Sequence, residues 1–163
     1  MIQIKSTASG KEYTIGKLER GYPQYMDRLY MFNYIPEELR GCAHFLTCGN
    51  DKMIPEDQPC FSLEMDSPAD VYVLYADKHP VLPKWLMEYE RTRMNVTRLD
   101  TSASDLKGYF SLYKKGFPAG IIQFYGNSTH EMLDQDWYVN TNGGGYCMYT
   151  VAVINPSSTE NVR

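Results

Sequence analysis

One glycine-rich segment has the combination of side chains that sugar binding requires. In DQDWYVNTNGGG, residues 134–145, two aromatic rings stand among carboxylates and amides. An aromatic ring packs against the apolar C–H face of a sugar, while carboxylate and amide groups form hydrogen bonds with its hydroxyls. We therefore predict a glycan-binding site made of Trp137, Tyr138, Asp134, Asp136, Asn140 and Asn142. The alternative is that Trp137 clamps a long loop onto the rest of the domain.

Catalysis on an acidic polysaccharide would need other residues. A lyase requires a base and a positive group that stabilises the carboxylate of the sugar. The candidates for these roles are Tyr89, Arg91, Arg93 and His130. A hydrolase requires two carboxylates about 5–10 Å apart, a distance that spacing along the chain does not reveal. Binding without catalysis is the preferred interpretation, and a small polysaccharide-active enzyme is the alternative.

Metal ligation has little support in the sequence. His44, His79 and His130 stand in separate segments, without the HxH or HExxH spacing of a zinc site. Aspartates near predicted strand ends could hold calcium together with backbone carbonyl oxygens. These aspartates are Asp27, Asp51, Asp66, Asp77, Asp134 and Asp136. Their spacing matches no calcium motif, so we predict no metal and no other cofactor, with calcium as the alternative.

The cysteines also form no motif. Cys42, Cys48, Cys60 and Cys147 include no CxxC pair, which disfavours a zinc knuckle and a thioredoxin-like site. Free thiols, buried as small hydrophobes, are preferred over two disulfides, which could form in any of three connectivities. A thiol nucleophile at Cys48 or Cys147, activated by a histidine, has no local support.

The overall charge limits the possible partners. Sixteen lysines and arginines against 20 aspartates and glutamates give a net charge of −4 over 163 residues. This balance provides no basic field for a nucleic acid. No apolar run reaches the ~18 residues of a membrane span, and the first ten residues lack the apolar core of a signal peptide. Within the fold we expect Asp27 and Arg28 to form an internal ion pair or to act as hydrogen-bond partners of the backbone.

The apolar segments predict a β-rich fold. They are short, rich in valine, isoleucine, tyrosine and phenylalanine, and separated by glycine, proline, asparagine or aspartate. We expect strands at residues 13–18, 27–35, 42–51, 61–67, 69–77, 109–116, 121–125 and 146–155, with a further candidate at 94–100. In segment 61–67 the alternation places Phe61, Leu63 and Met65 inward and Ser62, Glu64 and Asp66 outward. Segment 27–35 is apolar on both faces, so we expect it to be covered on both sides.

One helix and two long loops complete the predicted fold. Trp85, Leu86 and Tyr89 have helical spacing, which predicts a helix of two or three turns within 82–93, near residues 83–91. The polar segments 101–108 and 128–145 are expected to be loops. The fold class is therefore all-β. We predict a single-domain β-sandwich over residues 1–163, jelly-roll-like with one short helix, a core of about 12–154 and a flexible tail at 155–163.

Several of these segments resemble a known domain. In order, they are YMDRLYMFNYIPEELRG, LTCGNDK, FSLEMDSPADVYVLYAD, PKWL, YKKGFPAGIIQFYGN and MYTVAVI. They are similar to the signature segments of a small β-sandwich accessory domain appended to secreted polysaccharide-degrading enzymes. The same domain occurs in uncharacterised extracellular proteins of marine animals. The chain departs from that pattern at LTCGND, where threonine-alanine-asparagine is expected before the aspartate, and in the long segment 128–145.

The resemblance implies a location and partners. It implies an extracellular or secreted protein, a polysaccharide or glycan ligand, and a neighbouring catalytic domain. It also assigns segment 113–127 to the framework, because Pro118 and Gly120 shape a turn before a strand. The leading hypothesis is a non-catalytic carbohydrate-binding or accessory domain, and a structural adhesion or assembly domain is a further alternative. Should the loop not bind the glycan, the next candidate is the sheet face around Tyr30, Phe32 and Tyr34.

Overall fold

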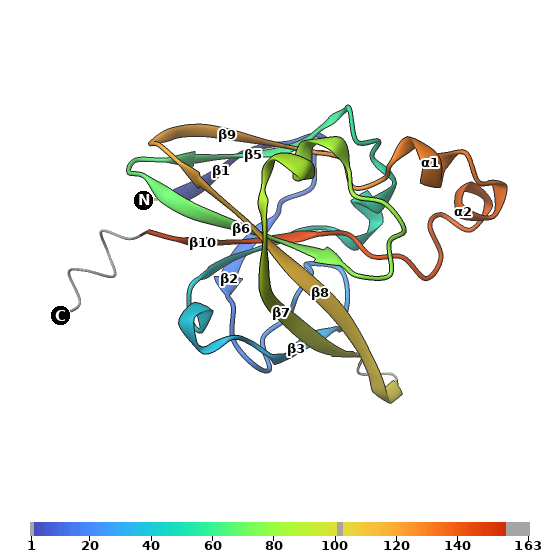
Figure 1. Cartoon of the computed structure of the whole chain (residues 1–163), viewed down its shortest axis with the longest axis horizontal. Coiled ribbons are helices and arrows are strands. Elements are labelled where there is room, and N and C mark those ends of the chain that lie inside the picture. The colour runs from blue at the N-terminus through green and yellow to red at the C-terminus, as the bar shows by residue number, and fades with distance from the viewer. Residues whose placement is uncertain (1, 101–102, 156–163) are drawn as a thin grey trace.

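Two antiparallel β-sheets of unequal width build the chain (Figure 1). A computed structural model describes residues 2–100 and 103–155. The smaller sheet has three strands in the order β1 (Ile2–Thr7), β5 (Pro59–Met65) and β9 (Gly120–Tyr125). The larger sheet has seven, in the order β2 (Thr14–Lys17), β4 (Ala43–Leu46), β10 (Thr150–Ile154), β6 (Ala69–Ala76), β8 (Ala103–Phe117), β7 (Glu90–Asp100) and β3 (Met31–Tyr34). The predicted all-β, sandwich-like fold is confirmed.

The larger sheet is covered on both faces, and strand β6 shows why its sequence is almost continuously apolar. Val71, Val73 and Tyr75 belong to the core between the two sheets, whereas Tyr72 and Leu74 belong to a second core on the other face. Each fully buried side chain of this size contributes about 1.5–3 kcal/mol. The second core is closed by residues from the chain before β4, namely Leu18, Phe32, Ile35 and Leu39.

The alternation in β5 is confirmed for its inward side chains and wrong for one outward side chain. Phe61, Leu63 and Met65 are buried, as predicted. Ser62 is also buried, because β1 pairs with β5 and Ser6 Oγ lies 2.7 Å from Ser62 Oγ. No strand was predicted at residues 2–7. The corner at residues 67–68 joins β5 to β6, which lie in different sheets.

Local helical spacing was misleading at residues 82–93. The segment contains a short 3-10 helix, η3 (Lys84–Glu88), and strand β7 begins at Glu90. Strand β7 pairs with β8 from Glu90 to Asp100, apart from an irregularity between Arg91 and Asn95, and this long-range pairing overrides a weak local helical preference. Trp85 packs against the core and donates its indole N–H to the Gly126 carbonyl at 2.9 Å.

Two other predicted segments differ from the structure. Segment 27–35 contains only the edge strand β3, where Met31 and Tyr34 are exposed, so it is not covered on both sides. Of the polar segment 101–108, residues 103–108 extend β8, while 101 and 102 lie outside the described residues. The predicted tail, apart from Asn155, also lies outside them.

Short helices replace parts of predicted strands and loops. Strand β4 stops at Leu46, and the 3-10 helix η2 (Gly49–Met53) follows it. A single 3-10 turn, η1 (Glu37–Leu39), lies between β3 and β4. The predicted loop 128–145 contains α1 (His130–Leu133) and α2 (Asp136–Asn140), which lie together at one end of the sheets (Figure 1). Among the described residues, no helix is long and apolar enough to cross a membrane.

Candidate functional site

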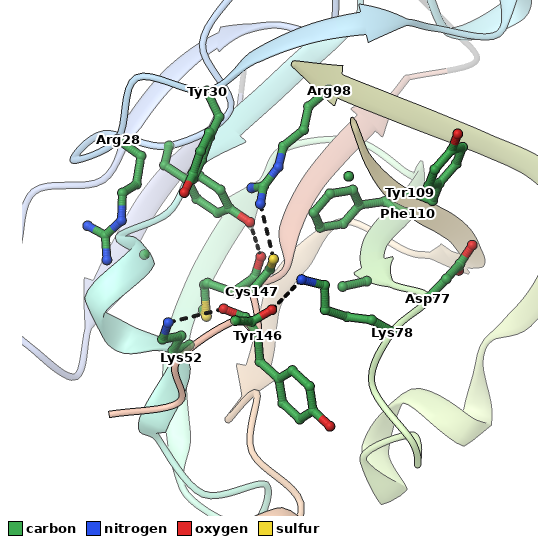
Figure 2. A pocket seen from close by; sticks show the side chains of 16 residues that line it. Arg28, Tyr30, Lys52, Asp77, Lys78, Arg98, Tyr109, Phe110, Tyr146 and Cys147 are labelled. Atoms are coloured by element: carbon green, nitrogen blue, oxygen red, sulfur yellow. Dashed lines mark hydrogen bonds between the residues drawn. The ribbon is translucent and has the colours of Figure 1, made fainter. Parts of the chain in front are cut away.

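A pocket of about 360 Å³ opens beside the segment that leads into β10 (Figure 2). Its walls come from the segment 25–30 before β3, from η2, from the turn after β6, from β7 and β8, and from residues 145–148. The charged lining residues are Arg28, Lys52, Lys78, Arg98 and Asp77, and the aromatic ones are Tyr25, Tyr30, Tyr109, Phe110 and Tyr146. The volume lies at the lower end of the ~300–1,000 Å³ typical of small-molecule sites. We call it the cationic pocket, because four cations line it in a chain whose net charge is −4.

Aromatic rings hold the guanidinium group of Arg98 in this pocket. Arg98 is only 8% exposed, and its Cζ lies 3.9 Å from the centroid of the Tyr30 ring. The Phe110 ring is 5.1 Å away and the Tyr25 ring 5.6 Å away. Cation–π attraction compensates part of the cost of removing the guanidinium from water. Arg98 therefore places a fixed positive charge in the wall.

Hydrogen bonds use only part of the capacity of Arg98. Its Nη1 donates to Gln24 Oε1 at 3.2 Å. Its Nη2 donates to Cys147 Sγ at 3.1 Å, the bond drawn in Figure 2. A guanidinium group has five N–H donors, so these two bonds leave further donors for other partners.

Two lysines reach the pocket from opposite sides of the 145–147 segment (Figure 2). Lys52 Nζ donates to the Tyr146 carbonyl at 3.1 Å, and Lys78 Nζ donates to the Gly145 carbonyl. An ammonium group has three donors, so each lysine retains two. Both lysines can therefore hold the backbone and still bind a ligand.

The pocket cations repel one another. Burial lowers the pKa of Lys52, and the positive charges of Arg28, Lys78 and Arg98 lower it further. A negative charge placed among them would relieve both effects, because it would stabilise the protonated ammonium.

Few carboxylates balance these charges. Within residues 2–100 and 103–155, Lys52, Lys78 and Arg98 have no carboxylate oxygen within 4.0 Å of their nitrogens. Asp77 Oδ1 accepts a hydrogen bond from Ser111 Oγ at 2.6 Å. Arg28 differs from the other three cations, because its Nη1 lies 2.8 Å from the carboxylate oxygen Oδ2 of Asp27.

Glycines make room for two of the cations. Arg98 on β7 is paired with Gly108 on β8, and a Cβ at Gly108 would lie 2.7 Å from Arg98 Nε. A Cβ at Gly49 would lie 3.0 Å from Arg28 Cζ. Separations this short would force the arginine to move, so the absence of a side chain at these positions lets both arginines lie against the backbone.

The predicted loop site adjoins this pocket through one ring contact. Trp137 is 44% exposed, and its ring centroid lies 5.4 Å from that of Tyr146, which lines the pocket. The indole N–H of Trp137 donates to Gln135 Oε1 at 2.6 Å. Tyr138, by contrast, is buried, and its hydroxyl lies 2.6 Å from Ser128 Oγ. Trp137 therefore offers a ring face to solvent, whereas Tyr138 fastens α2 to the fold.

The other predicted loop residues lie on the surface around Trp137. Asp134 caps the C-terminus of α1, Asp136 begins α2 and Asn140 ends it. Asn142 has a positive φ of 52°, a conformation that asparagine tolerates better than most residues. All four are exposed, and none of them lines the cationic pocket.

The histidines lie apart. His44 is completely buried, which lowers its pKa to about 3. Burial, with the charges of Lys78 and Lys52, also lowers the pKa of His79 to about 3, and its Nε2 accepts the backbone N–H of Cys147 at 3.1 Å. In the part of the chain that the structure describes, no three His, Cys, Asp or Glu side chains gather as a metal-ion site would require.

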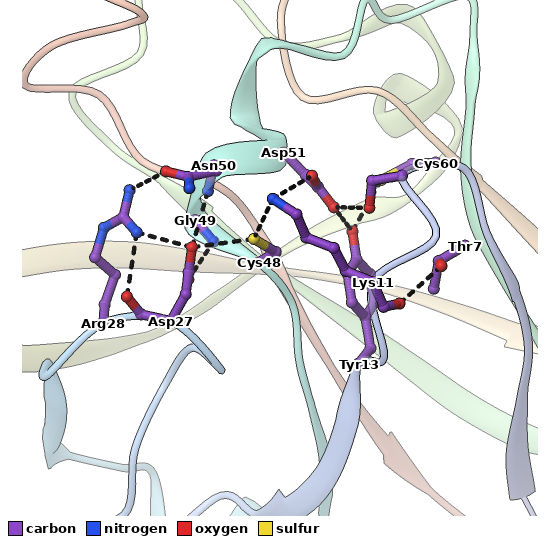
Figure 3. Close-up of polar contacts among 11 residues, drawn as sticks. Thr7, Lys11, Tyr13, Asp27, Arg28, Cys48, Gly49, Asn50, Asp51 and Cys60 are labelled. Atoms are coloured by element: carbon purple, nitrogen blue, oxygen red, sulfur yellow. Dashed lines mark hydrogen bonds and ion pairs between the residues drawn. The ribbon is translucent and has the colours of Figure 1, made fainter.

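A second charged region lies next to the pocket and has a different character (Figure 3). Asp27 Oδ2 lies 2.8 Å from Arg28 Nη1, which confirms the predicted ion pair. Asp27 also accepts two hydrogen bonds, one from the Cys48 thiol at 3.0 Å and one from the Gly49 backbone N–H at 2.7 Å. Burial alone would raise the pKa of Asp27, but the hydrogen bonds from Cys48 and the backbone, with the charge of Arg28, lower it overall.

The network continues to a buried aspartate. Asp51 is 5% exposed and accepts hydrogen bonds from the hydroxyls of Tyr13 and of Ser9, the latter at 2.8 Å. Lys11 Nζ lies 4.0 Å from Asp51 Oδ1 and 3.4 Å from Cys48 Sγ. We call this set the paired network; its members are Asp27, Arg28, Cys48, Lys11, Tyr13 and Asp51. All four cysteines of the chain are free thiols.

A second hollow, of about 590 Å³, brings together two of the four residues predicted for a lyase. Tyr89 and Arg91 line it together with His79. Arg93 does not line it, and His130 lies elsewhere, 3.6 Å from Asp57. Burial raises the pKa of Tyr89, with a smaller contribution from the charge of Glu88. A tyrosine with a raised pKa is a poor base at neutral pH.

Sequence reasoning missed the cationic pocket because its cations are distant in the chain and belong to four different segments. One local signal was available. Lys52 and Lys78 each follow an aspartate directly after a predicted strand, in GNDK and YADK. Residues directly after a strand lie in loops, and binding sites are commonly formed by loop residues that the strands hold in place.

Comparisons with known proteins give a structural likeness. No protein-family model matches the sequence, and no curated protein matches it. The structure is similar to part of a β-glucuronidase from glycoside hydrolase family 2, with a TM-score of 0.69 and 21% identity over 91% of this chain. It is also similar to part of a family 138 enzyme targeting pectin rhamnogalacturonan II, with a TM-score of 0.57 and 17% identity over 80% of this chain.

The matched region is a small part of both enzymes, 14% and 15% of their chains. At these identities the likeness establishes the fold. Both enzymes are glycoside hydrolases, in agreement with the expected resemblance to domains of polysaccharide-degrading enzymes. The resemblance to proteins of marine animals stays a prediction.

Proposed function

We propose that this chain is a non-catalytic carbohydrate-binding domain that acts beside a catalytic domain on a polysaccharide. The observation that carries the proposal is the cationic pocket, whose aromatic and hydrogen-bonding side chains adjoin the exposed ring of Trp137. Flat rings with convergent polar groups are what sugar recognition requires. The similarity of the fold to small parts of two glycoside hydrolases supports the same class of function.

The composition of the pocket favours binding over hydrolysis. Glycosidic hydrolysis usually takes a pair of carboxylates on either side of the bond. Among the described lining residues, Asp77 is the single carboxylate. A neighbouring catalytic domain would supply the chemistry, and an extracellular location belongs to the same proposal.

The loop around Trp137 extends the proposed binding surface beyond the pocket. A polysaccharide is longer than one sugar unit, so neighbouring units need contacts outside a small cavity. Trp137 offers a ring, and Asp134, Asp136, Asn140 and Asn142 offer hydroxyl partners around it. Tyr138, although predicted as a ligand contact, would act here by fixing the position of α2.

The test is affinity electrophoresis, in which a soluble polysaccharide in the gel slows the migration of a protein that binds it. Trp137→Ala is the variant. We expect binding to weaken by about 1–3 kcal/mol, the scale of an aromatic anchor that becomes buried when the ligand binds. Val139→Ala is the matched control. Val139 is 47% exposed on the same helix, and this substitution removes apolar area without removing an aromatic ring. Failure of the wild-type chain to bind any neutral or acidic polysaccharide would favour an adhesion or assembly role instead.

A polysaccharide lyase is the second candidate function. It is favoured by the presence of Tyr89, Arg91 and His79 in one hollow. The raised pKa of Tyr89 argues against it. Appearance of unsaturated products from an acidic polysaccharide, abolished by Tyr89→Phe, would replace the binding proposal with the catalytic one.

A further inference from the structure

We infer that the cationic pocket recognises a sugar that carries an anionic substituent, a carboxylate or a sulfate. The inference rests on the proposed glycan-binding function and names the class of sugar. It starts from the imbalance of charge in the pocket, where Arg28, Lys52, Lys78 and Arg98 face one carboxylate, Asp77.

The unused donors of the cations point to an anion. Arg98 retains N–H donors beyond its bonds to Gln24 and Cys147, and Lys52 and Lys78 retain two each after their contacts in the fold. In the part of the chain described by the structure, these three have no carboxylate partner. Grouping like charges in a partly desolvated wall is unfavourable, and an anion with several oxygens reverses that cost.

The rigidity of the wall indicates a built site. Arg98 is buried and stacked on Tyr30, so it is already oriented before a ligand arrives. Gly108 leaves the space that this position needs. The two lysines are tied to neighbouring carbonyls, Gly145 and Tyr146. Cations held in place lose little side-chain entropy on binding.

Other features of the wall fit a sugar ring. Tyr109 is 55% exposed and lines the pocket, so its ring can pack on an apolar sugar face. Asp77, at the same side of the pocket in Figure 2, can accept hydrogen bonds from sugar hydroxyls. A simple inorganic anion would use the cations and leave these two residues idle.

The direct test is a titration of the whole chain with small probes, followed by amide NMR shifts and calorimetry. D-Glucuronate, D-galacturonate and D-glucose 6-sulfate are compared with D-glucose, methyl glucuronate ester, acetate and inorganic phosphate. We expect saturable shifts at residues 145–148 with at least one charged sugar, and none with glucose or the ester. The carboxylate and sulfate arms show which substituent is preferred. No response to the charged sugars, or equal affinity for acetate or phosphate, would overturn the inference.

Variants place the binding in the pocket. Lys78→Gln and Lys52→Gln should each weaken the charged sugar about tenfold, the typical effect of losing a hydrogen bond to a charged group. Lys17→Gln is the matched control, because Lys17 is an exposed lysine on β2 and does not line the pocket. Arg98→Lys should weaken binding while retaining the charge, since the planar fork is lost. Equal affinity of the Lys52 and Lys78 variants and the wild type would contradict the inference.

A polymer experiment separates this inference from the proposed function. Polygalacturonate is compared with its carboxyl-reduced, neutral product. If both polymers slow the migration of the protein in affinity electrophoresis equally, and if Lys78→Gln does not change this, glycan binding is supported and the preference for an anionic sugar is overturned. Binding of the charged monosaccharide without retention of any polysaccharide would support the pocket and contradict the proposed polysaccharide function.

Discussion

The cationic pocket and the paired network lie side by side and share Arg28, but they differ in whether their charged groups have partners of opposite charge. In the network, Asp27 and Asp51 are surrounded by donors, and Lys11 and Arg28 face carboxylates (Figure 3). In the pocket, Lys52, Lys78 and Arg98 hold backbone, amide and thiol groups but no carboxylate within the described residues (Figure 2).

The difference separates charges that stabilise the fold from charges available to a ligand. A buried charge with a full set of partners is costly to remove, because its partners are then left unsatisfied. A cation with unused donors gains its remaining partners only from water or from a ligand. Mutations in the network should therefore change stability, and mutations in the pocket should change binding.

The largest effect is expected for Asp51→Ala. Removal of this buried carboxylate leaves the hydroxyls of Tyr13 and Ser9 without the oxygen that accepts their hydrogen bonds, and it removes the ion-pair partner of Lys11. The free energy of unfolding should fall by about 2–4 kcal/mol in chemical denaturation. Asp136→Ala, at an exposed aspartate, should change it by less than about 0.5 kcal/mol. Equal losses in the two variants would break the comparison.

A strand glycine should affect binding. Gly108→Ala places a Cβ 2.7 Å from Arg98 Nε and forces the guanidinium to move. We expect the affinity for the charged monosaccharide to fall several-fold in calorimetry. Gly116→Ala is the control on the same strand, where the nearest atom to a Cβ, Asp70 Oδ1, lies at an ordinary 3.4 Å. If both variants bind as the wild type does, Arg98 is not a ligand contact.

A smaller effect concerns pH. The pKa of Asp27 is lowered in the fold from its usual 3.8, so ionised Asp27 contributes stability that is fully present above that value. This contribution is lost as the pH falls through the lowered pKa. Asp27→Asn should therefore be less stable than the wild type at neutral pH, by about 1 kcal/mol, and the difference should shrink in acid. Denaturation curves that stay equally far apart at all pH values would contradict this assignment.

The smallest effect is expected from chelation. The sequence predicts no metal, and the stability described here rests on the apolar cores and on side-chain hydrogen bonds. Dialysis against a chelator should leave the melting temperature within a few degrees of its starting value. A fall of more than about 10 °C, equivalent to several kcal/mol for a domain of this size, would reveal a structural ion such as calcium.

The sequence by itself determined the fold class and much of the central framework. Alternation in β5 and the apolar run of β6 follow from the burial of one or both faces of a strand, a local property that the order of residues records. Where local and long-range preferences disagree, the sequence misleads. The helical spacing of Trp85, Leu86 and Tyr89 yielded to the pairing of β7 with β8.

The loop around Trp137 was recognised from composition, because aromatic rings, amides and glycines stand next to one another in the chain. The sequence could not show that Tyr138 is buried or that Trp137 contacts Tyr146. Only the tertiary structure decided which cations share a pocket. The pocket cations come from different segments, namely Arg28, Lys52, Lys78 and Arg98. Their charges lie close together because β7 pairs with β8 and because residues 145–148 lie between the two lysines. Electrostatic interaction depends on distance in space, which separation along the chain does not determine.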